Sequence, residues 1–141
     1  GERLTTHPLS PKGYFILLYP NLFVSTEKIF KTFDHHLPSL QASVPSEALI
    51  GPNNLKPVTF SCYPQLQTLE DTLLALGIDH VYMTGTGSTL FMPFETLKEA
   101  DYFNNELKKK FPDYFIHLAS PVSTGTRITE ISPKRTVPAD K

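Results

Sequence analysis

The sequence lacks the features that mark disulfide-rich, zinc-binding or membrane-spanning proteins. Its single cysteine, Cys62, can form neither an intramolecular disulfide nor a zinc site made of thiolates alone. A lone cysteine behaves as a small hydrophobic side chain, so we expect it to be buried in a cytoplasmic protein, where thiols stay reduced. No apolar run approaches the roughly 20 residues that span a bilayer, so no membrane partner is predicted.

An excess of charge of one sign is also missing. The 141 residues include 13 Lys and Arg against 14 Asp and Glu, which gives a net charge of −1. Nucleic-acid-binding domains usually carry a strongly basic face, so we expect no nucleic-acid partner. The sequence is instead 40% hydrophobic and 11% aromatic, which predicts a folded domain with a core. We expect one domain over residues 1–122 and a tail over residues 123–141 that need not be ordered.

Hydrophobic periodicity and turn residues predict an alternation of strands and helices. The apolar run 14–19 predicts a buried central strand, because it is short, rich in aromatic and branched side chains, and ended by Pro20. Further strands are predicted at residues 2–5, 80–83, 88–94 and 114–119, and helices at residues 25–33, 54–61, 64–76 and 96–111. This order predicts an α+β fold, a two-layer ferredoxin-like sandwich with a mostly antiparallel sheet and helices on one face.

Two of the predicted helices carry signals for both their ends and their buried faces. Gly77 is placed to end the first, whose apolar stripe consists of Leu66, Leu69, Leu73 and Leu76. A capping box begins the second, where Thr96 is followed three residues later by Glu99. Its stripe consists of Ala100, Phe103, Leu107 and Phe111. By spacing, both stripes belong to the core.

The most distinctive segment is residues 83–91, where Gly85 and Gly87 are flanked by hydroxyl side chains between two predicted strands. Glycine permits φ > 0, and successive amides in such a turn can face one concavity and bind an anion. The segment is not a Walker loop, because no lysine follows Gly87, and it lacks the third glycine and the helix of a dinucleotide fingerprint. A plain turn is the commoner meaning of this pattern, so both interpretations stay open.

Other residues that could carry chemistry give weaker signals. His35 and His36 are adjacent and would diverge on a helix, so we expect no metal site. No G-x-S-x-G elbow is present, which leaves serine-histidine-aspartate catalysis unsupported. Phe30 can either pack inward with Phe33, or lie half-exposed beside Lys31 and stack on a planar ring near a phosphate.

Taken together, several segments resemble the GHMP kinases, the superfamily of galactose, homoserine, mevalonate and phosphomevalonate kinases. Residues 83–91 resemble its third conserved motif. In chain order, the further similar segments are Gly1-Glu2-x-Leu4, Pro20 with residues 25–30, Asn54-Leu55-x-Pro57-Val58, and Pro64-x-Leu66. The resemblance is greatest to the C-terminal half of the kinases that phosphorylate a cytidine diphosphate conjugate of methylerythritol in the non-mevalonate isoprenoid pathway.

The resemblance implies phosphoryl transfer from ATP, with Mg²⁺, in a full-length enzyme of the bacterial cytosol or a plastid. The family's phosphate loop and its catalytic aspartate and lysine belong to an N-terminal kinase domain that these 141 residues do not contain. We therefore expect no catalytic residue, metal ligand or cofactor in this segment, and no activity from it alone. The residues implied in substrate binding are Thr26, Phe30 and Lys31, and those implied in supporting the phosphate cradle are Gly85, Thr86, Gly87 and Ser88.

Two other functions stay open. The chain could be a free-standing ferredoxin-like ligand-binding or regulatory domain that takes a small anion or metabolite at residues 84–88. It could also belong to a sister GHMP kinase that acts on homoserine or mevalonate. Phe30 separates a sister GHMP kinase from the kinases of the cytidine conjugate, because only a substrate that carries a base needs a ring to stack on it.

Overall fold

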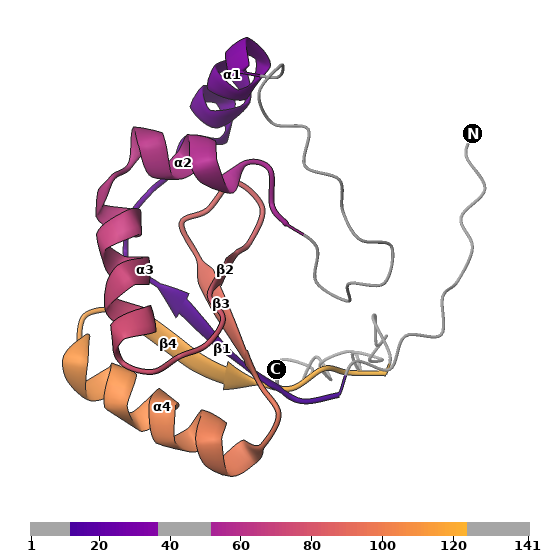
Figure 1. Ribbon diagram of the computed structural model, residues 1–141, viewed down its shortest axis with the longest axis vertical. Coiled ribbons are helices and arrows are strands. Elements are labelled where there is room, and N and C mark those ends of the chain that lie inside the picture. The colour runs from indigo at the N-terminus through magenta and orange to yellow at the C-terminus, as the bar shows by residue number, and fades with distance from the viewer. Residues whose placement is uncertain (1–11, 37–51, 124–141) are drawn as a thin grey trace, which may run out of the picture.

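The computed structural model describes residues 12–36 and 52–123, and its centre is a four-stranded sheet (Figure 1). The strands are β1 (Tyr14–Tyr19), β2 (Tyr82–Met83), β3 (Leu90–Phe94) and β4 (Phe115–Ala119). They pair in the order β2-β3-β1-β4, and every pair is antiparallel. This arrangement confirms the predicted ferredoxin-like α+β fold, and both outer strands, β2 and β4, follow a helical connection.

Four helices complete the described fold. They are α1 (Thr26–His36), α2 (Lys56–Cys62), α3 (Gln65–Ala75) and α4 (Leu97–Lys110). Figure 1 shows α3 and α4 on one side of the sheet, with α1 and α2 near the end where β2 and β3 are joined. Contacts of α4 with β1, β3 and β4 form the main helix–sheet interface, while α1 packs on α2 and α2 on α3. The joined end of β2 and β3 therefore lies near α1 and α2.

The helix ends follow the chemistry of their capping residues. Thr96 has extended backbone angles, and its hydroxyl accepts the amide hydrogen of Glu99 at 3.3 Å, which confirms the predicted cap of α4. Ser25 acts in the same way on the amide of Lys28 at 3.3 Å, at the start of α1. Gly77 takes a φ of +94°, and its amide donates to the carbonyl oxygen of Leu74 at 3.0 Å, so it ends α3 as expected.

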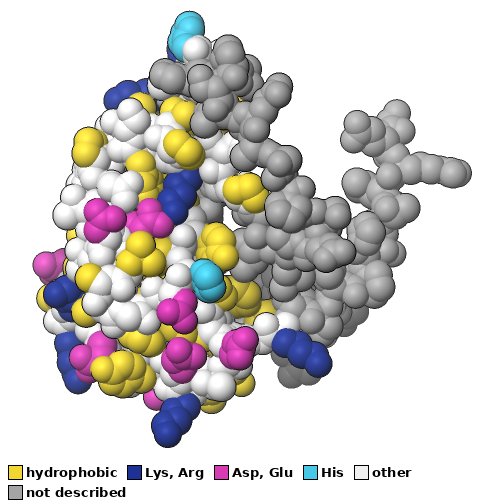
Figure 2. Space-filling view, viewed as in Figure 1, with side chains coloured by type: hydrophobic (Ala, Val, Ile, Leu, Met, Phe, Trp, Pro, Cys, Tyr) yellow, Lys and Arg dark blue, Asp and Glu magenta, His cyan; other side chains and the backbone are white. Residues whose placement is uncertain are grey.

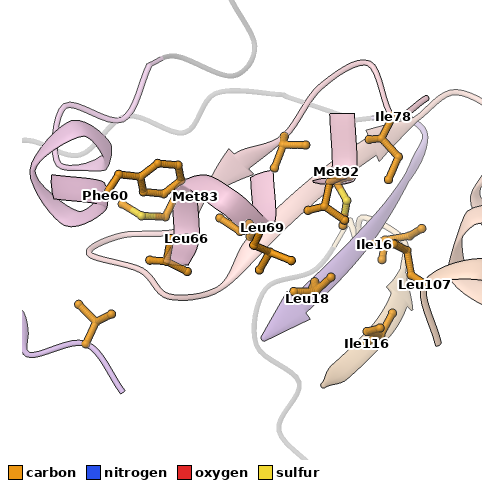
Figure 3. Packing of buried hydrophobic residues seen from close by; sticks show 14 of the residues in the cluster. Ile16, Leu18, Phe60, Leu66, Leu69, Ile78, Met83, Met92, Leu107 and Ile116 are labelled. Atoms are coloured by element: carbon orange, nitrogen blue, oxygen red, sulfur yellow. The ribbon is translucent and has the colours of Figure 1, made fainter. Parts of the chain in front are cut away.

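The core lies between the helices and one face of the sheet. Alternate residues of β1 and β3 point into it, and Ile16 pairs with Met92 as Leu18 pairs with Leu90. Figure 3 shows this cluster, with Phe60 and Met83 at one end and Leu107 and Ile116 at the other. Three members of the predicted α3 stripe are buried, but the prediction for Leu76 is wrong, because it is 39% exposed at the end of the helix. Ile78, two residues further on, is buried instead.

The opposite face of the sheet is also apolar. Alternation along β1 places Phe15 and Leu17 there, next to Phe91 of β3, and the Phe15 and Phe91 ring centroids are 6.3 Å apart. Phe91 also stacks on Tyr82 of β2 at 5.3 Å. Helices cover only the core face of the sheet within the described residues, although the continuous apolar run of β1 predicts burial on both.

Some predicted strands are shorter in the structure, and some predictions concern residues outside the described ranges. The strands predicted at 80–83 and 88–94 are shorter, since β2 and β3 contain only Tyr82–Met83 and Leu90–Phe94. Cys62 is partly buried rather than fully buried. The strand at residues 2–5, the segment at residues 1–4 that resembles the family, and the tail after residue 123 lie outside the described residues. In the described part of the chain, none of the helices is both long enough and apolar enough to cross a bilayer.

Candidate functional site

Residues 84–88 form a tight turn between β2 and β3. The amide of Gly87 donates to the carbonyl oxygen of Thr84 at 2.8 Å, and the amide of Thr84 donates to the carbonyl oxygen of Thr89 at 3.0 Å. Gly85 and Gly87 take φ values of +49° and +84°, in the region that other residues adopt at a cost of about 1–2 kcal/mol. The two glycines are therefore required by the shape of this turn.

Side chains from α2 and from the residues just before it hold the turn on one side. The side-chain amide of Asn53 donates to the carbonyl oxygens of Met83 at 2.9 Å and Gly85 at 2.7 Å. Thr59, which is fully buried, donates from its hydroxyl to the carbonyl oxygen of Thr86 at 3.0 Å. These contacts join α2 and the residues before it to the glycine turn, although the two segments are distant in sequence.

A buried serine holds the far end of the turn. Ser88 is 3% exposed, and its hydroxyl donates to the carbonyl oxygen of Leu22 in the segment before α1. A Cβ on Gly87 would lie 2.9 Å from the sulfur of Met83 and 3.2 Å from the methyl group of Thr59. A Cβ on Gly85 would meet nothing within 4 Å. Gly87 thus faces the protein, whereas Gly85 faces open space.

The hydroxyl groups of Thr26 and Thr86 lie 3.1 Å apart, so the start of α1 touches the glycine turn. Phe30, one helical turn after Thr26, is on the same face of α1 and is 49% exposed. It does not pack inward, unlike Phe33, which packs against the core. The structure thus brings the predicted substrate residue Thr26 to the edge of the predicted phosphate cradle, and Phe30 lies one helical turn further along α1.

Lys31 is arranged differently. Its ammonium pairs with Glu27 at 2.5 Å, one turn earlier on the surface of α1, and both side chains are about three-quarters exposed (72% and 75%). Pairs of this kind contribute only about 0.3–0.5 kcal/mol, so the ammonium can leave Glu27 at little cost. Neighbouring helical residues point about 100° apart, so Lys31 and Phe30 do not share one face of α1.

The residue that sequence reasoning missed is Asn53. The resemblance drew attention to Asn54, but Asn54 is exposed and Asn53 makes the contacts with the turn. Asn53 also accepts the amide hydrogen of Leu55 at 3.0 Å, as an asparagine before a helix commonly does. The sequence could therefore indicate a cap at Asn53, but not its contacts with the glycine turn. Thr59 was missed as well, since a threonine inside a short helix looks like any other core residue.

The donor set of the site suits an anion better than a metal ion. It consists of backbone amides and hydroxyl groups. Within residues 12–36 and 52–123, no three His, Cys, Asp or Glu side chains are placed to hold a metal ion. His35, His80 and His117 are all exposed. Hydroxyl and amide donors of this kind are typical of phosphate-binding sites.

A groove of about 720 Å³ lies between α2 and α3. The ammonium of Lys56, which lines it, pairs with Glu70 and lies 5.3 Å from the centre of the Phe60 ring. This lysine is therefore already neutralised within the fold. Figure 2 shows acidic and basic side chains interspersed on the face it draws, which agrees with the balanced charge of the sequence.

Comparison with known protein families identifies the family to which this domain belongs. The model of the family described as the C-terminal part of GHMP kinases matches residues 30–113, which include α2, α3, the glycine turn and α4. The chain belongs to the GHMP kinase C-terminal family. The expected superfamily is thereby confirmed, and the glycine turn lies inside the matched region.

Relatives of this GHMP kinase segment are named as kinases of one substrate. The 4-diphosphocytidyl-2-C-methyl-D-erythritol kinase of Enterococcus faecalis is 29% identical over 119 residues, which cover 77% of this chain and 42% of that protein. The enzyme of the same name from Syntrophus aciditrophicus is 32% identical over 108 residues, covering 71% of this chain and 39% of the relative. The chain thus spans about two fifths of the length of these relatives.

A solved structure supports the fold of the GHMP kinase segment. The crystal structure of a 4-(cytidine 5'-diphospho)-2C-methyl-D-erythritol kinase superposes with a TM-score of 0.65 at 22% identity. The match covers 79% of this chain and 45% of that one. At this identity the likeness establishes the shared architecture, and the substrate needs separate support.

Proposed function

We propose that this chain is the C-terminal, substrate-side part of a kinase that phosphorylates a hydroxyl of 4-diphosphocytidyl-2-C-methyl-D-erythritol in non-mevalonate isoprenoid synthesis, in the cytosol. The γ-phosphoryl group of ATP would pass to the hydroxyl oxygen, with ADP as the leaving group and the hydroxyl proton taken by a base. The family match and the names of the relatives support this proposal. The base, the ATP-binding loop and the Mg²⁺ site would come from an N-terminal domain outside this chain.

The observation that carries the proposal is the contact between the hydroxyl groups of Thr26 and Thr86 at 3.1 Å. Thr26 would meet the methylerythritol unit, and the glycine turn would line the path of the transferred phosphate. A phosphoryl acceptor must lie next to the phosphate, because catalysis of this reaction depends on positioning and on electrostatic stabilisation. Transfer between the phosphate and the acceptor hydroxyl therefore requires that the residues predicted to bind them, the glycine turn and Thr26, lie in contact.

The residues of this chain fit an ATP phosphate but not a resident Mg²⁺ ion. The turn offers amide and hydroxyl donors to phosphate oxygens, whereas Mg²⁺ prefers carboxylate and water oxygens. In the described residues, Asp and Glu side chains form no cluster beside the turn. The role we assign to Gly85, Thr86, Gly87 and Ser88 is therefore to support the phosphate cradle and not to bind the metal.

Comparison of this chain with a longer product of the same gene tests the proposal. The 141 residues alone should release no ADP from ATP and the cytidine conjugate, whereas the longer protein should. The gene upstream of Gly1 should encode a proline followed by G-L-G-G-G-S-S, the family's phosphate loop. A gene that starts immediately before Gly1 would overturn the proposal and favour a free-standing ligand-binding domain.

Phe30 tests which substrate the longer protein uses. If its exposed ring stacks on cytosine, Phe30→Ala should raise the KM for the cytidine conjugate about tenfold, because a base–aromatic stack contributes about 1–3 kcal/mol. The kcat should change little. Turnover of homoserine or mevalonate by the longer protein, with a KM that Phe30→Ala does not alter, would assign the chain to a sister GHMP kinase.

A further inference from the structure

Asn53 and Thr59 bind three carbonyl oxygens of the segment that contains the glycine turn. Asn53 donates hydrogen bonds to the carbonyl oxygens of Met83 and Gly85, and Thr59 donates one to the carbonyl oxygen of Thr86. Both hydrogens of the Asn53 side-chain amide are used, and its oxygen accepts the amide hydrogen of Leu55. A flipped amide would set its oxygen against two carbonyl oxygens, so the orientation of Asn53 is fixed by its partners.

Holding a carbonyl group also sets the direction of the amide that follows it. In a planar trans peptide the C=O and N–H bonds point in opposite directions. The carbonyl of Gly85 points at Asn53, so the amide of Thr86 points away from α2. The carbonyl of Thr86 points at Thr59, so the amide of Gly87 points away from Thr59 and donates to the carbonyl of Thr84. Because that carbonyl is turned toward Gly87, the amide of Gly85 points away from this contact. Within residues 12–36 and 52–123, neither the Gly85 nor the Thr86 amide has an acceptor.

We infer that Asn53 and Thr59 are positioning residues, which direct the amides of Gly85 and Thr86 toward a phosphate oxygen without touching the ligand themselves. This inference rests on the proposed function, since it gives the free amides a phosphate to bind. Preorganised amides stabilise negative charge because they need no reorganisation when the charge arrives. A turn without these two side chains would have to be ordered by the ligand at each binding event.

Thr59 adds a steric contribution to the hydrogen bonds. Its methyl group lies against Gly87, where a Cβ would approach it to 3.2 Å. The hydroxyl and the methyl group of one buried side chain thus fix two successive residues of the turn. Thr59→Val removes only the hydrogen bond and Thr59→Ser removes only the methyl group, which separates the two contributions.

Kinetics of the longer protein give the first test. Asn53→Ala and Thr59→Val should lower kcat/KM for ATP about 10- to 100-fold, the effect of misplacing one or two donors. Asn53→Asp should be at least as damaging, because it keeps the shape but cannot donate when ionised. Thr59→Ser should restore most of the activity that Thr59→Val loses. The matched control is Asn54→Ala, whose exposed side chain has no partner among the described residues; equal kcat/KM values for Asn53→Ala and Asn54→Ala would overturn the inference.

Titration of this 141-residue chain with inorganic tripolyphosphate, followed by amide resonances in NMR spectra, gives a test that needs no kinase activity. The Gly85 and Thr86 amides should shift in the unsubstituted chain, in Asn54→Ala and in Thr59→Ser, but not in Asn53→Ala or Thr59→Val. Shifts of equal size in all five proteins, or none in the unsubstituted chain, would overturn the inference. The expected shifts, together with a longer protein that does not phosphorylate the cytidine conjugate, would reject the proposed function and leave the inference standing.

Discussion

The glycine turn and the N-terminal end of α1 touch each other, but they are held in different ways. Three side chains, those of Asn53, Thr59 and Ser88, hold the turn and the residues at its two ends by hydrogen bonds, and two of them are buried. The end of α1 instead presents exposed side chains, including Thr26 and a Phe30 ring that is 49% exposed. The part that would meet phosphate is thus preorganised, whereas the part that would meet the rest of the substrate stays open.

The difference between the fixed glycine turn and the open end of α1 has a chemical reason. A phosphate group is the same in every cycle, so donors fixed in advance lower the cost of ordering the site. A large conjugate with a base and a sugar-like unit needs room to enter, and its surface must be covered from more than one side. An open α1 end next to a rigid turn suits a site that a second domain completes. Substitutions in the turn should therefore cost more stability than substitutions at the end of α1.

Gly87→Ala should have the largest effect. The new Cβ would meet the sulfur of Met83 at 2.9 Å, at a φ of +84° that alanine rarely adopts. Left-handed strain and overpacking together predict a loss of about 2–4 kcal/mol in the free energy of unfolding. Gly85→Ala is the matched control, because its Cβ meets nothing and only the strain of about 1–2 kcal/mol remains. Urea denaturation measures both, and equal losses would show that the turn is not packed against α2.

Ser88→Ala should come next. It removes a buried donor and leaves the carbonyl oxygen of Leu22 without this partner, which predicts a loss of about 1–2 kcal/mol. Ser61→Ala, at an exposed position of α2, should change stability by less than about 0.5 kcal/mol. A Ser88 variant as stable as the Ser61 variant in thermal unfolding would contradict the account of a turn fixed at both ends.

Thr26→Val should have a smaller effect on stability than either. Its hydroxyl bonds to that of Thr86 at 3.1 Å in an exposed position, so water can replace the partner, and we expect a loss of about 0.5 kcal/mol or less. Thr26→Ser keeps the hydroxyl and should match the unsubstituted chain. A loss above about 1.5 kcal/mol for the valine variant in urea denaturation would mean that α1 is clamped as firmly as the turn.

Glu27→Gln should have the smallest effect. It removes the exposed pair with Lys31, which contributes about 0.3–0.5 kcal/mol and is screened by salt. The difference from the unsubstituted chain should disappear in thermal unfolding at 1 M salt. A larger loss that persists in high salt would show that this surface of α1 is structurally fixed after all.

Much of the fold could be predicted because each element carries its own local signal. The run 14–19 gave β1 with the observed bounds, and Thr96 with Glu99 gave the start of α4. Gly77 gave the end of α3. The error at Leu76 arose because the apolar spacing continues into the last turn of the helix, where the chain already leaves the core. Apolar periodicity shows which face of a helix a residue lies on. It does not show where along the helix that face stops contacting the core.

The candidate site could be predicted only in part. Gly85 and Gly87 were evident, because few residues other than glycine tolerate their backbone angles. The Asn53 and Thr59 contacts could not be found in the same way, since they join segments that come together only in the folded chain. Asparagine and threonine are common in loops and helices, and nothing local distinguishes those that hold a turn. The roles of Thr26, Phe30 and Lys31 in substrate binding stay predictions, as does the domain boundary near residue 122.

The strand order β2-β3-β1-β4 has a consequence for how the chain folds. The central strand β1 is made first, yet its partners come much later, since Leu18 pairs with both Leu90 and Ile116. Of the paired strands, only β2 and β3 are neighbours in sequence. The hairpin that contains the glycine turn can therefore form before β1 has paired with β3 and β4. Sheets closed by such distant pairings fold slowly, in milliseconds to seconds, and keep apolar strands exposed meanwhile. During synthesis β1 stays unpaired on its β4 side until residue 119 has left the ribosome, so its apolar edge is exposed for longer than the β2–β3 hairpin.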